Sequence, residues 1–198
     1  MIEDCTALIL AGGESRRMGK DKANLSFAGS TLLERIALEL SPLFHEIIVS
    51  TRAPRPDCPL PQVLDHPEHH GPLAGLLAGL EHAGTSWIFA VACDMPFISA
   101  PLVEYLSMLR EGHDAVVPIA SNHPQPMAAF YSSKRLDALQ DLMQDGKSHS
   151  MREFLDRISV LYVNEEELME HDPMLKTFFD LDTPRDFAEA SEMTKAGK

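Results

Sequence analysis

Two adjacent glycines and a group of cations follow the first apolar run of this 198-residue chain, where residues 6–22 read TALILAGGESRRMGKDK. Gly12 and Gly13 remove side chains where a backbone must turn sharply and approach a ligand, and their N–H groups can point at phosphate oxygens. Positive charge follows at once, from Arg16, Arg17, Lys20 and Lys22. The pattern predicts a loop that binds a polyanion.

This loop differs from two common phosphate-binding fingerprints. It is not the G-x-x-x-x-G-K-[ST] of a P-loop, and no G-x-G-x-x-G follows the apolar run. A glycine pair alone is equally compatible with a tight turn beside a solvated charged face. The joint occurrence of the apolar run, GG, RR, Met-Gly and Asp-Lys favours polyanion binding. The absence of both fingerprints argues against an ordinary P-loop NTPase and against a dinucleotide-binding protein.

Aspartates follow two further apolar runs. Asp94 comes directly after WIFAVAC, and Asp65 lies in VLDHPEHHGPLAG. Ligands of open parallel sheets bind at the carboxyl ends of the strands, and Mg²⁺ takes one or two carboxylates beside substrate phosphates. Asp94 is therefore a candidate Mg²⁺ ligand, with a turn or helix cap before PFISAPL as the alternative. The H-P-E-H-H cluster lacks the spacing of a metal site, and we expect a solvated loop there.

The elements that must position these residues alternate along the chain. Apolar runs at 6–10, 46–50, 87–92 and 114–118, with further candidates at 127–131 and 158–163, predict strands. Amphipathic segments between them predict helices at 31–40, at 72–83, from Ser99 or Ala100 to Gly112, at 134–143 and at 150–157. This alternation predicts an α/β fold with a mainly parallel sheet, and the length predicts a single domain over residues 1–198.

Helix starts carry the clearest local signals. Thr31 and Glu34 form a capping-box pattern, and Thr183, Pro184 and Asp186 open the C-terminal helix. Pro72 suits the first position of the second helix, whose small residues would let it lie close to the sheet.

Composition limits the partners and the compartment. Acidic residues outnumber basic ones by 30 to 17, a formal net charge of -13, which disfavours nucleic acid as a partner. Cys5, Cys58 and Cys93 are far apart and match no zinc spacing, so we expect free thiols in a reducing cytoplasm. The start MIEDCTALIL has no basic region and no long apolar segment, so we expect a soluble protein with neither a signal peptide nor a membrane span.

The glycine-rich loop, L-A-G-G-x-S-R-R-M-G-x-D-K, resembles that of nucleotidyltransferases of the NDP-sugar pyrophosphorylase type, and most closely that of the molybdenum cofactor guanylyltransferases. Further segments resemble motifs of the same family, namely CDMPFI, GPLAG, QPMAAFY, GKSHSMREFL and FFDLDTPRDF. The resemblance covers nearly the whole chain. It implies a three-layer Rossmann-like fold of the nucleotide-diphospho-sugar transferase type, with a mainly parallel sheet and helices on both faces.

The resemblance also implies an activity and a site. The reaction would transfer GMP from GTP to molybdenum-molybdopterin, forming molybdopterin guanine dinucleotide and releasing pyrophosphate, with Mg²⁺ as cofactor. The protein would also make transient contacts with proteins that deliver the molybdenum cofactor, or with the molybdoenzymes that receive the product. The implied nucleotide site comprises Leu10, Ala11, Gly12, Gly13, Lys22, Asp65 and Asp94. Lys22 would reach the phosphates, Arg17 would lie toward the reacting groups, and Asp94 would bind Mg²⁺.

One departure from the family pattern bears on the metal. The family has asparagines before T-P, where this chain has Asp180 and Asp182. We hypothesise that Asp182, either alone or together with Asp180, shares a divalent ion with Asp94; the alternative is that Asp182 only supports the start of the last helix. Lys147 and Arg152 are candidates for cationic contacts on the pterin side, or are simply solvated.

Other functions fit parts of the same pattern. A cytidylyltransferase for the same cofactor, or a sugar-phosphate nucleotidyltransferase, keeps the chemistry and changes the substrates. A non-catalytic nucleotide-binding regulatory protein would keep the loop without turnover. The GPLAG segment favours guanine, and the presence of both Lys22 and Asp94 favours an enzyme.

Overall fold

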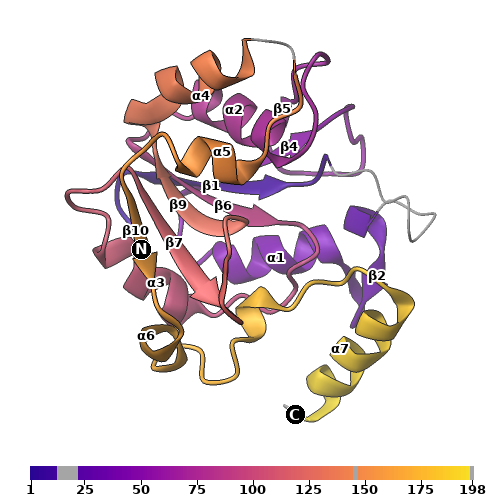
Figure 1. Ribbon diagram of the computed structural model, residues 1–198. Coiled ribbons are helices and arrows are strands. Elements are labelled where there is room, and N and C mark those ends of the chain that lie inside the picture. The colour runs from indigo at the N-terminus through magenta and orange to yellow at the C-terminus, as the bar shows by residue number, and fades with distance from the viewer. Residues whose placement is uncertain (13–21, 145–146, 197–198) are drawn as a thin grey trace.

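The computed structural model describes residues 1–12, 22–144 and 147–196. Within these residues, a sheet of eight strands runs through the centre of the molecule (Figure 1). Its strands are β1 (Cys5–Leu10), β4 (Glu46–Thr51), β5 (Gln62–Leu64), β6 (Trp87–Ala92), β7 (Ala115–Ala120), β8 (His123–Pro124), β9 (Ala128–Ser132) and β10 (Val160–Val163). Their order is β10-β7-β9-β6-β1-β4-β5, with β8 paired to β7.

The sheet is parallel from β6 through β1 and β4 to β5, and again between β7 and β10. β9 is antiparallel to both of its neighbours, β6 and β7, so β6 and β7 point the same way. Ile9 of the central strand pairs with Val49 on one side and Val91 on the other, and all three are buried. Buried, β-branched runs of this kind are typical of parallel strands covered on both faces.

Helices cover both faces of the sheet, as Figure 1 shows. Buried side chains of α1 (Leu32–Leu40), α3 (Ala100–Met108) and α6 (Glu165–Met169) pack in one cluster on one face. Those of α2 (Pro72–His82), α4 (Leu136–Met143) and α5 (Met151–Leu155) pack in a second cluster on the other. The three-layer α/β fold predicted from the sequence is thus confirmed.

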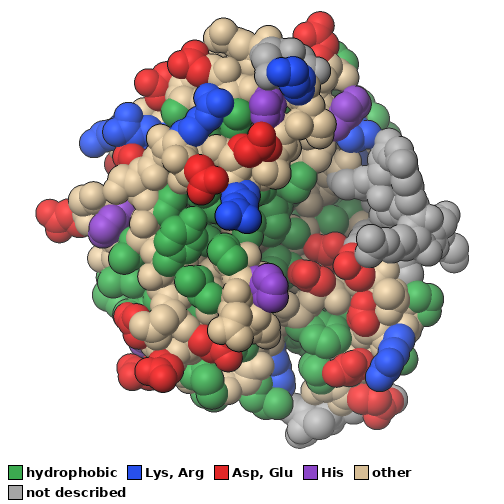
Figure 2. Space-filling view, in the orientation of Figure 1, with side chains coloured by type: hydrophobic (Ala, Val, Ile, Leu, Met, Phe, Trp, Pro, Cys, Tyr) green, Lys and Arg blue, Asp and Glu red, His purple; other side chains and the backbone are tan. Residues whose placement is uncertain are grey.

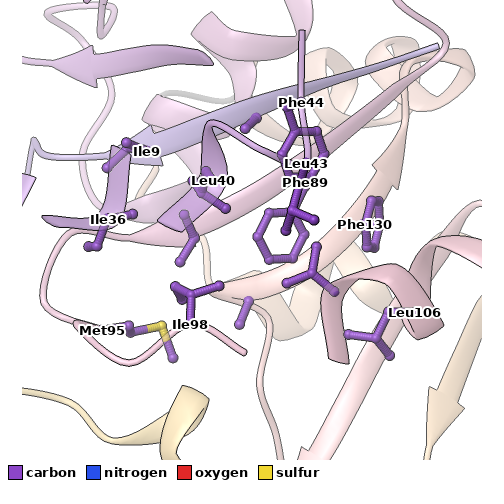
Figure 3. Close-up of a cluster of buried hydrophobic side chains, with 14 of the residues drawn as sticks. Ile9, Ile36, Leu40, Leu43, Phe44, Phe89, Met95, Ile98, Leu106 and Phe130 are labelled. Atoms are coloured by element: carbon purple, nitrogen blue, oxygen red, sulfur yellow. The ribbon is translucent and has the colours of Figure 1, made fainter. Parts of the chain in front are cut away.

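The first of these clusters is built on aromatic rings (Figure 3). Phe89 of β6 stacks on Phe44 at 5.7 Å between ring centroids and lies 4.9 Å from Phe130 of β9. Ile36 and Leu40 of α1 close the cluster from the helix side, both fully buried. Burying side chains of this size contributes about 1.5–3 kcal/mol each.

A smaller unit joins the two ends of the chain. The hairpin of β2 (Ser26–Phe27) and β3 (Ser30–Thr31) packs against the C-terminal helix α7 (Pro184–Ala196). The Phe27 and Phe187 rings meet edge to face at 5.4 Å, and Leu181 is buried beside them. Short 3₁₀ helices complete the described residues, η1 (Lys22–Asn24), η2 (Ser133–Arg135) and η3 (Lys176–Phe178).

The predicted helix starts are confirmed in atomic detail. Thr31 and Glu34 form a reciprocal capping box at α1. Thr183 Oγ1 accepts from the N–H of Asp186, whose carboxylate accepts from the N–H of Thr183. Pro72 stands at the start of α2, where the glycines at 75 and 79 lie directly against the sheet.

One expectation needs correction, and some short elements were not predicted. The third helix ends at Met108 rather than continuing to Gly112, because residues 109–113 form turns in which Gly112 has a positive φ of 82°. The sequence patterns also missed β5, the β2–β3 hairpin and α6, all of which are short.

The cysteines are free thiols, as expected. Burial raises the pKa of the Cys5 thiol to about 12, so this side chain behaves as a small apolar group. Among the described residues, no helix combines the length and the apolar character needed to cross a membrane.

Candidate active site

The carboxyl end of β1 opens the glycine-rich loop at the edge of the sheet where β4, β5, β6 and β7 also end. The N–H of Ala11 donates to the carbonyl of Ser50 at 2.9 Å, and the N–H of Cys93 donates to the carbonyl of Leu10 at 3.1 Å. The loop therefore leaves the sheet while still tied to strands on both sides. Gly13 and Arg17 lie outside the described residues.

Asp65 lies against the first glycine of the loop. A Cβ atom at Gly12 would stand 2.4 Å from Oδ2 of Asp65, far inside van der Waals contact. Ser50 donates from its hydroxyl to the other carboxylate oxygen at 2.5 Å, and the Asp65 N–H donates to the Thr51 carbonyl at 3.0 Å. The structure thus brings Gly12 and Asp65 together, as the sequence analysis expected of a shared site.

Arg52 and His70 stand beside this pair, and the sequence analysis missed both. The Cγ of Arg52 would lie 3.6 Å from a Cβ at Gly12, and its guanidinium contacts Nδ1 of His70 at 3.2 Å. Ser50 and Arg52 lie at the carboxyl end of β4, so the rule that ligands bind at strand ends points to them as well.

His66, in the same HPEHH segment as His70, contacts α2. His66 pairs with Glu81 of α2 at 2.8 Å, and Gln140 of α4 donates to the same carboxylate at 2.9 Å. Burial raises the pKa of Glu81, but the hydrogen bonds from His66 and Gln140 outweigh it and leave the pKa below its ordinary value. These contacts anchor the loop that carries Asp65 to the helices behind it.

Asp94 follows β6 in a turn closed by the N–H of Met95 on the carbonyl of Ala92. The next helix, α3, has Ser99 as its N-cap, so Asp94 does not cap it. The carbonyl of Asp94 instead accepts the N–H of Leu181 at 2.9 Å. This bond joins the end of β6 to the segment before α7, although the two are far apart in the sequence.

The Leu181 contact places the backbone of the segment that carries Asp182 beside the end of β6. Leu181 is fully buried, whereas Asp180 is exposed and Asp182 is half-buried, as expected for alternate residues of an extended segment. Thr183 and Asp186 form the cap of α7. Acidic side chains gather on the face drawn in Figure 2, around the start of α7.

Two carboxylates on adjacent segments fit a hard divalent cation, because Mg²⁺ uses one or two carboxylates and completes its coordination with phosphate oxygens and water. Within residues 1–12, 22–144 and 147–196, no group of three or more His, Cys, Asp and Glu is arranged as a metal site.

Lys22 is the first residue of η1, and its side chain lies outside the described part of the chain. The other two residues of η1 make contacts with the rest of the protein. Ala23 is fully buried, and Asn24 accepts a hydrogen bond from Arg55 at 3.0 Å. Lys147 and Arg152, the candidates for the pterin side, are both exposed.

A family model described as a MobA-like NTP transferase domain matches residues 7–160. The chain belongs to this family. The matched range contains Gly12, Asp65 and Asp94 and ends before Asp182.

Individual proteins of similar sequence are named as enzymes of molybdenum cofactor synthesis. The chain is 35% identical over 192 residues to a probable molybdenum cofactor guanylyltransferase of Pelotomaculum thermopropionicum, with 96% of this chain and 93% of the relative covered.

Another relative, named molybdenum cofactor guanylyltransferase, comes from Syntrophotalea carbinolica and is 34% identical, covering 92% of this chain and 88% of its own. Among solved structures, molybdopterin-guanine dinucleotide biosynthesis protein A from Archaeoglobus fulgidus superimposes with a TM-score of 0.86 at 28% identity, covering 96% and 99% of the two chains. A 2-C-methyl-D-erythritol 4-phosphate cytidylyltransferase from Thermus thermophilus gives a TM-score of 0.72 at 18% identity over 96% and 98%, and shares the fold of the MobA-like family.

Proposed function

We propose that this protein is a molybdenum cofactor guanylyltransferase, which transfers GMP from GTP to molybdenum-molybdopterin and releases pyrophosphate. The observations that support the proposal are two contacts at the carboxyl edge of the sheet, one between Gly12 and Asp65 and one between Asp94 and the segment that precedes Asp182. Both contacts join distant parts of the sequence. The names of the relatives supply the substrates.

The chemistry needs little acid–base help from the protein. An oxygen of the terminal phosphate of molybdopterin attacks the α-phosphorus of GTP, and the bond from that phosphorus to the oxygen bridging to the β-phosphate breaks. Pyrophosphate leaves with the electron pair. The second pKa of a phosphate monoester is about 6, so the attacking group is already largely ionised at neutral pH. The protein can then act by placing two polyanions in line and neutralising their charge.

Each residue has a task in this scheme. The backbone around Gly12 approaches the nucleotide, and the fixed carboxylate of Asp65 accepts hydrogen bonds from N–H groups of the guanine base. Lys22 and Arg17 supply positive charge to the phosphates. Asp94 and Asp182 would hold Mg²⁺, which, when bound, neutralises negative charge on the phosphate oxygens.

The setting follows from the same proposal. We place the reaction in the cytoplasm, where cysteines such as Cys5 stay in the thiol form. Transient contacts with the proteins that deliver molybdopterin, or that receive the product, belong to the same proposal.

The test is incubation of the full chain with GTP, Mg²⁺ and molybdenum-loaded molybdopterin, followed by mass analysis of the products. Molybdopterin guanine dinucleotide and one pyrophosphate per turnover are expected. Parallel reactions with CTP and ATP report the choice of base. Product formed from CTP instead of GTP would move the protein to the cytidylyltransferases, and the absence of any dinucleotide or pyrophosphate would leave nucleotide binding without turnover.

A further inference from the structure

Two side chains of opposite charge flank Gly12, and only one of them has a role in the scheme above. Asp65 approaches Gly12 through its carboxylate, and Arg52 approaches it through the carbons of its side chain. We propose that Arg52 is a second recognition residue for the base, which donates hydrogen bonds to O6 and N7 of guanine. This inference rests on the proposed function, and it concerns the choice of nucleotide rather than the transfer step.

The strand register places the two charged residues side by side. β4 and β5 pair in parallel with Ser50 opposite Val63 and Thr51 opposite Leu64. Arg52 is the residue after β4, and Asp65 is the residue after β5, so the two follow the last paired residues of neighbouring strands. Both therefore stand at the carboxyl edge of the sheet, in the position where ligands of parallel sheets bind.

His70 fixes the direction of the arginine. The contact of 3.2 Å between a terminal guanidinium nitrogen and Nδ1 of His70 draws the head of Arg52 toward the start of α2. The side chain is exposed, so a ligand seated on Gly12 can reach it. A guanidinium presents its N–H donors in a rigid planar fork, which suits two neighbouring acceptors.

The chemistry of guanine matches this arrangement. O6 and N7 are neighbouring acceptors, and arginine is the side chain most often found donating to both of them. N1–H and the 2-amino group are donors, which a carboxylate such as Asp65 accepts. Adenine and cytosine carry an amino group where guanine has O6, so the same arginine would face a donor. Arg52 would thus favour GTP and disfavour both ATP and CTP.

Two other roles of Arg52 would change nucleotide affinity or stability in a different way. An arginine that contacts the triphosphate would strengthen binding of every nucleotide equally. An arginine that only clamps His70 would change stability and leave nucleotide preference unchanged. The N7 position separates these roles, because 7-deaza-GTP differs from GTP only in lacking that acceptor.

The experiment measures dissociation constants of GTP, 7-deaza-GTP and ATP by titration calorimetry at one ionic strength. The proteins are the full-length parent, Arg52→Ala, Arg52→Gln, His70→Ala and the control Arg157→Ala. Arg157 is an exposed arginine that precedes β10 and so lies at the opposite edge of the sheet. Thermal unfolding of each variant reports whether the fold is retained.

The parent should bind GTP more tightly than 7-deaza-GTP. Arg52→Ala should weaken the binding of GTP by about 5- to 150-fold, the range for a bidentate base contact. It should weaken the binding of 7-deaza-GTP less, so that the two affinities converge. His70→Ala should give a smaller change in the same direction, and Arg157→Ala none. An equal loss for all three nucleotides, or no loss, would overturn the role of Arg52. A parent that binds no GTP would instead overturn the proposed function, and this inference with it.

Discussion

Oδ2 of Asp65 approaches the backbone of Gly12 so closely that a methyl group at Gly12 would lie 2.4 Å from it. Ser50 holds the same carboxylate from the other side. The carboxylate therefore has no room to retreat without losing its hydrogen bond to Ser50. The glycine is needed here for close approach, and its position links the loop after β1 to the loop after β5.

Gly12→Ala should displace Asp65 and weaken GTP binding. The loss of a hydrogen bond to a charged group typically costs about 1.5–3 kcal/mol, which is roughly 10- to 150-fold in affinity. Thermal stability should change little, since the site is at the surface edge of the sheet. The matched control is Gly84→Ala, because an added Cβ there meets no atom within 4 Å. Titration calorimetry with GTP measures the effect, and equal affinities in the two variants would remove the coupling of Gly12 and Asp65 from the site.

Gly79→Ala should act on stability instead. A Cβ at Gly79 would lie 2.4 Å from one methyl group of Leu8 and 3.0 Å from the other, and Leu8 is fully buried in the central strand. Overpacking of this kind costs about 1–3 kcal/mol. Urea denaturation of Gly79→Ala and of the control Gly84→Ala measures the difference. A free energy of unfolding equal to that of the parent would mean that α2 moves away from the sheet without cost.

The elements that could be predicted from the sequence are those whose signals are local. The caps at Thr31 and Thr183 need partners only three residues away, so their residue types alone predict the helix starts. The position of β9 between β6 and β7 depends on pairings with distant strands, and no short pattern encodes it. The end of α3 was misplaced because a glycine marks the left-handed turn that follows a helix, not the last helical residue.

The same distinction between local signals and long-range contacts applies to the candidate site. The loop at Gly12 and the carboxylate of Asp94 could be identified because each directly follows a strand whose apolar run is unmistakable. Arg52 follows an equally clear strand, but a lone arginine after a strand carries no distinctive pattern. Its relation to Asp65 depends on the register of β4 and β5, which only the fold specifies.

The cap of α1 should make stability depend on pH. Hydrogen bonds from the N–H and the hydroxyl of Thr31 hold the pKa of Glu34 below its ordinary value of 4.5. A carboxylate whose pKa is lower in the folded state stabilises above the unfolded pKa, and this contribution is lost as the pH falls through the folded pKa. Thr31→Ala should therefore destabilise more at pH 7 than at pH 3.

Urea denaturation at the two pH values measures this difference. The control is Ser41→Ala at the other end of α1, where the hydroxyl donates to the carbonyl of Leu38 and no carboxylate takes part. Its effect should be the same at both pH values. A Thr31→Ala effect that is also independent of pH would mean that Glu34 does not act through its charge.

Asp94→Ala and Lys22→Ala should each suppress guanylyl transfer and leave the fold intact. The Asp94 side chain does not belong to the buried apolar core, and the loss of one preorganised charge contact typically costs about 10²-fold or more in rate. Pyrophosphate release under saturating GTP measures turnover, and circular dichroism checks the fold. Lys134→Ala is the control for Lys22, since it removes the same charge from an exposed residue after the antiparallel strand β9, at the opposite edge of the sheet. A folded variant that turns over like the parent would exclude its residue from the mechanism.

Asp182→Asn restores the residue found in the related family and tests whether Asp182 is a metal ligand. The Leu181 N–H on the Asp94 carbonyl holds the two acidic segments together, and two carboxylates there would repel an incoming phosphate unless a cation lies between them. Thr183 and Asp186 form the cap of α7, so an amide at 182 should leave the stability of that helix unchanged.

The decisive measurement is the Mg²⁺ concentration that gives half-maximal turnover. A neutral amide is a weaker ligand for a hard cation than a carboxylate, so Asp182→Asn should need more Mg²⁺ than the parent and reach a similar plateau. Asp180→Asn removes the same charge from a neighbouring, more exposed residue, and its Mg²⁺ titration shows whether that carboxylate takes part as well. If Asp182→Asn and the parent give superimposable Mg²⁺ titrations, Asp182 is not a ligand, and Asp94 is the carboxylate on which metal binding at this site depends.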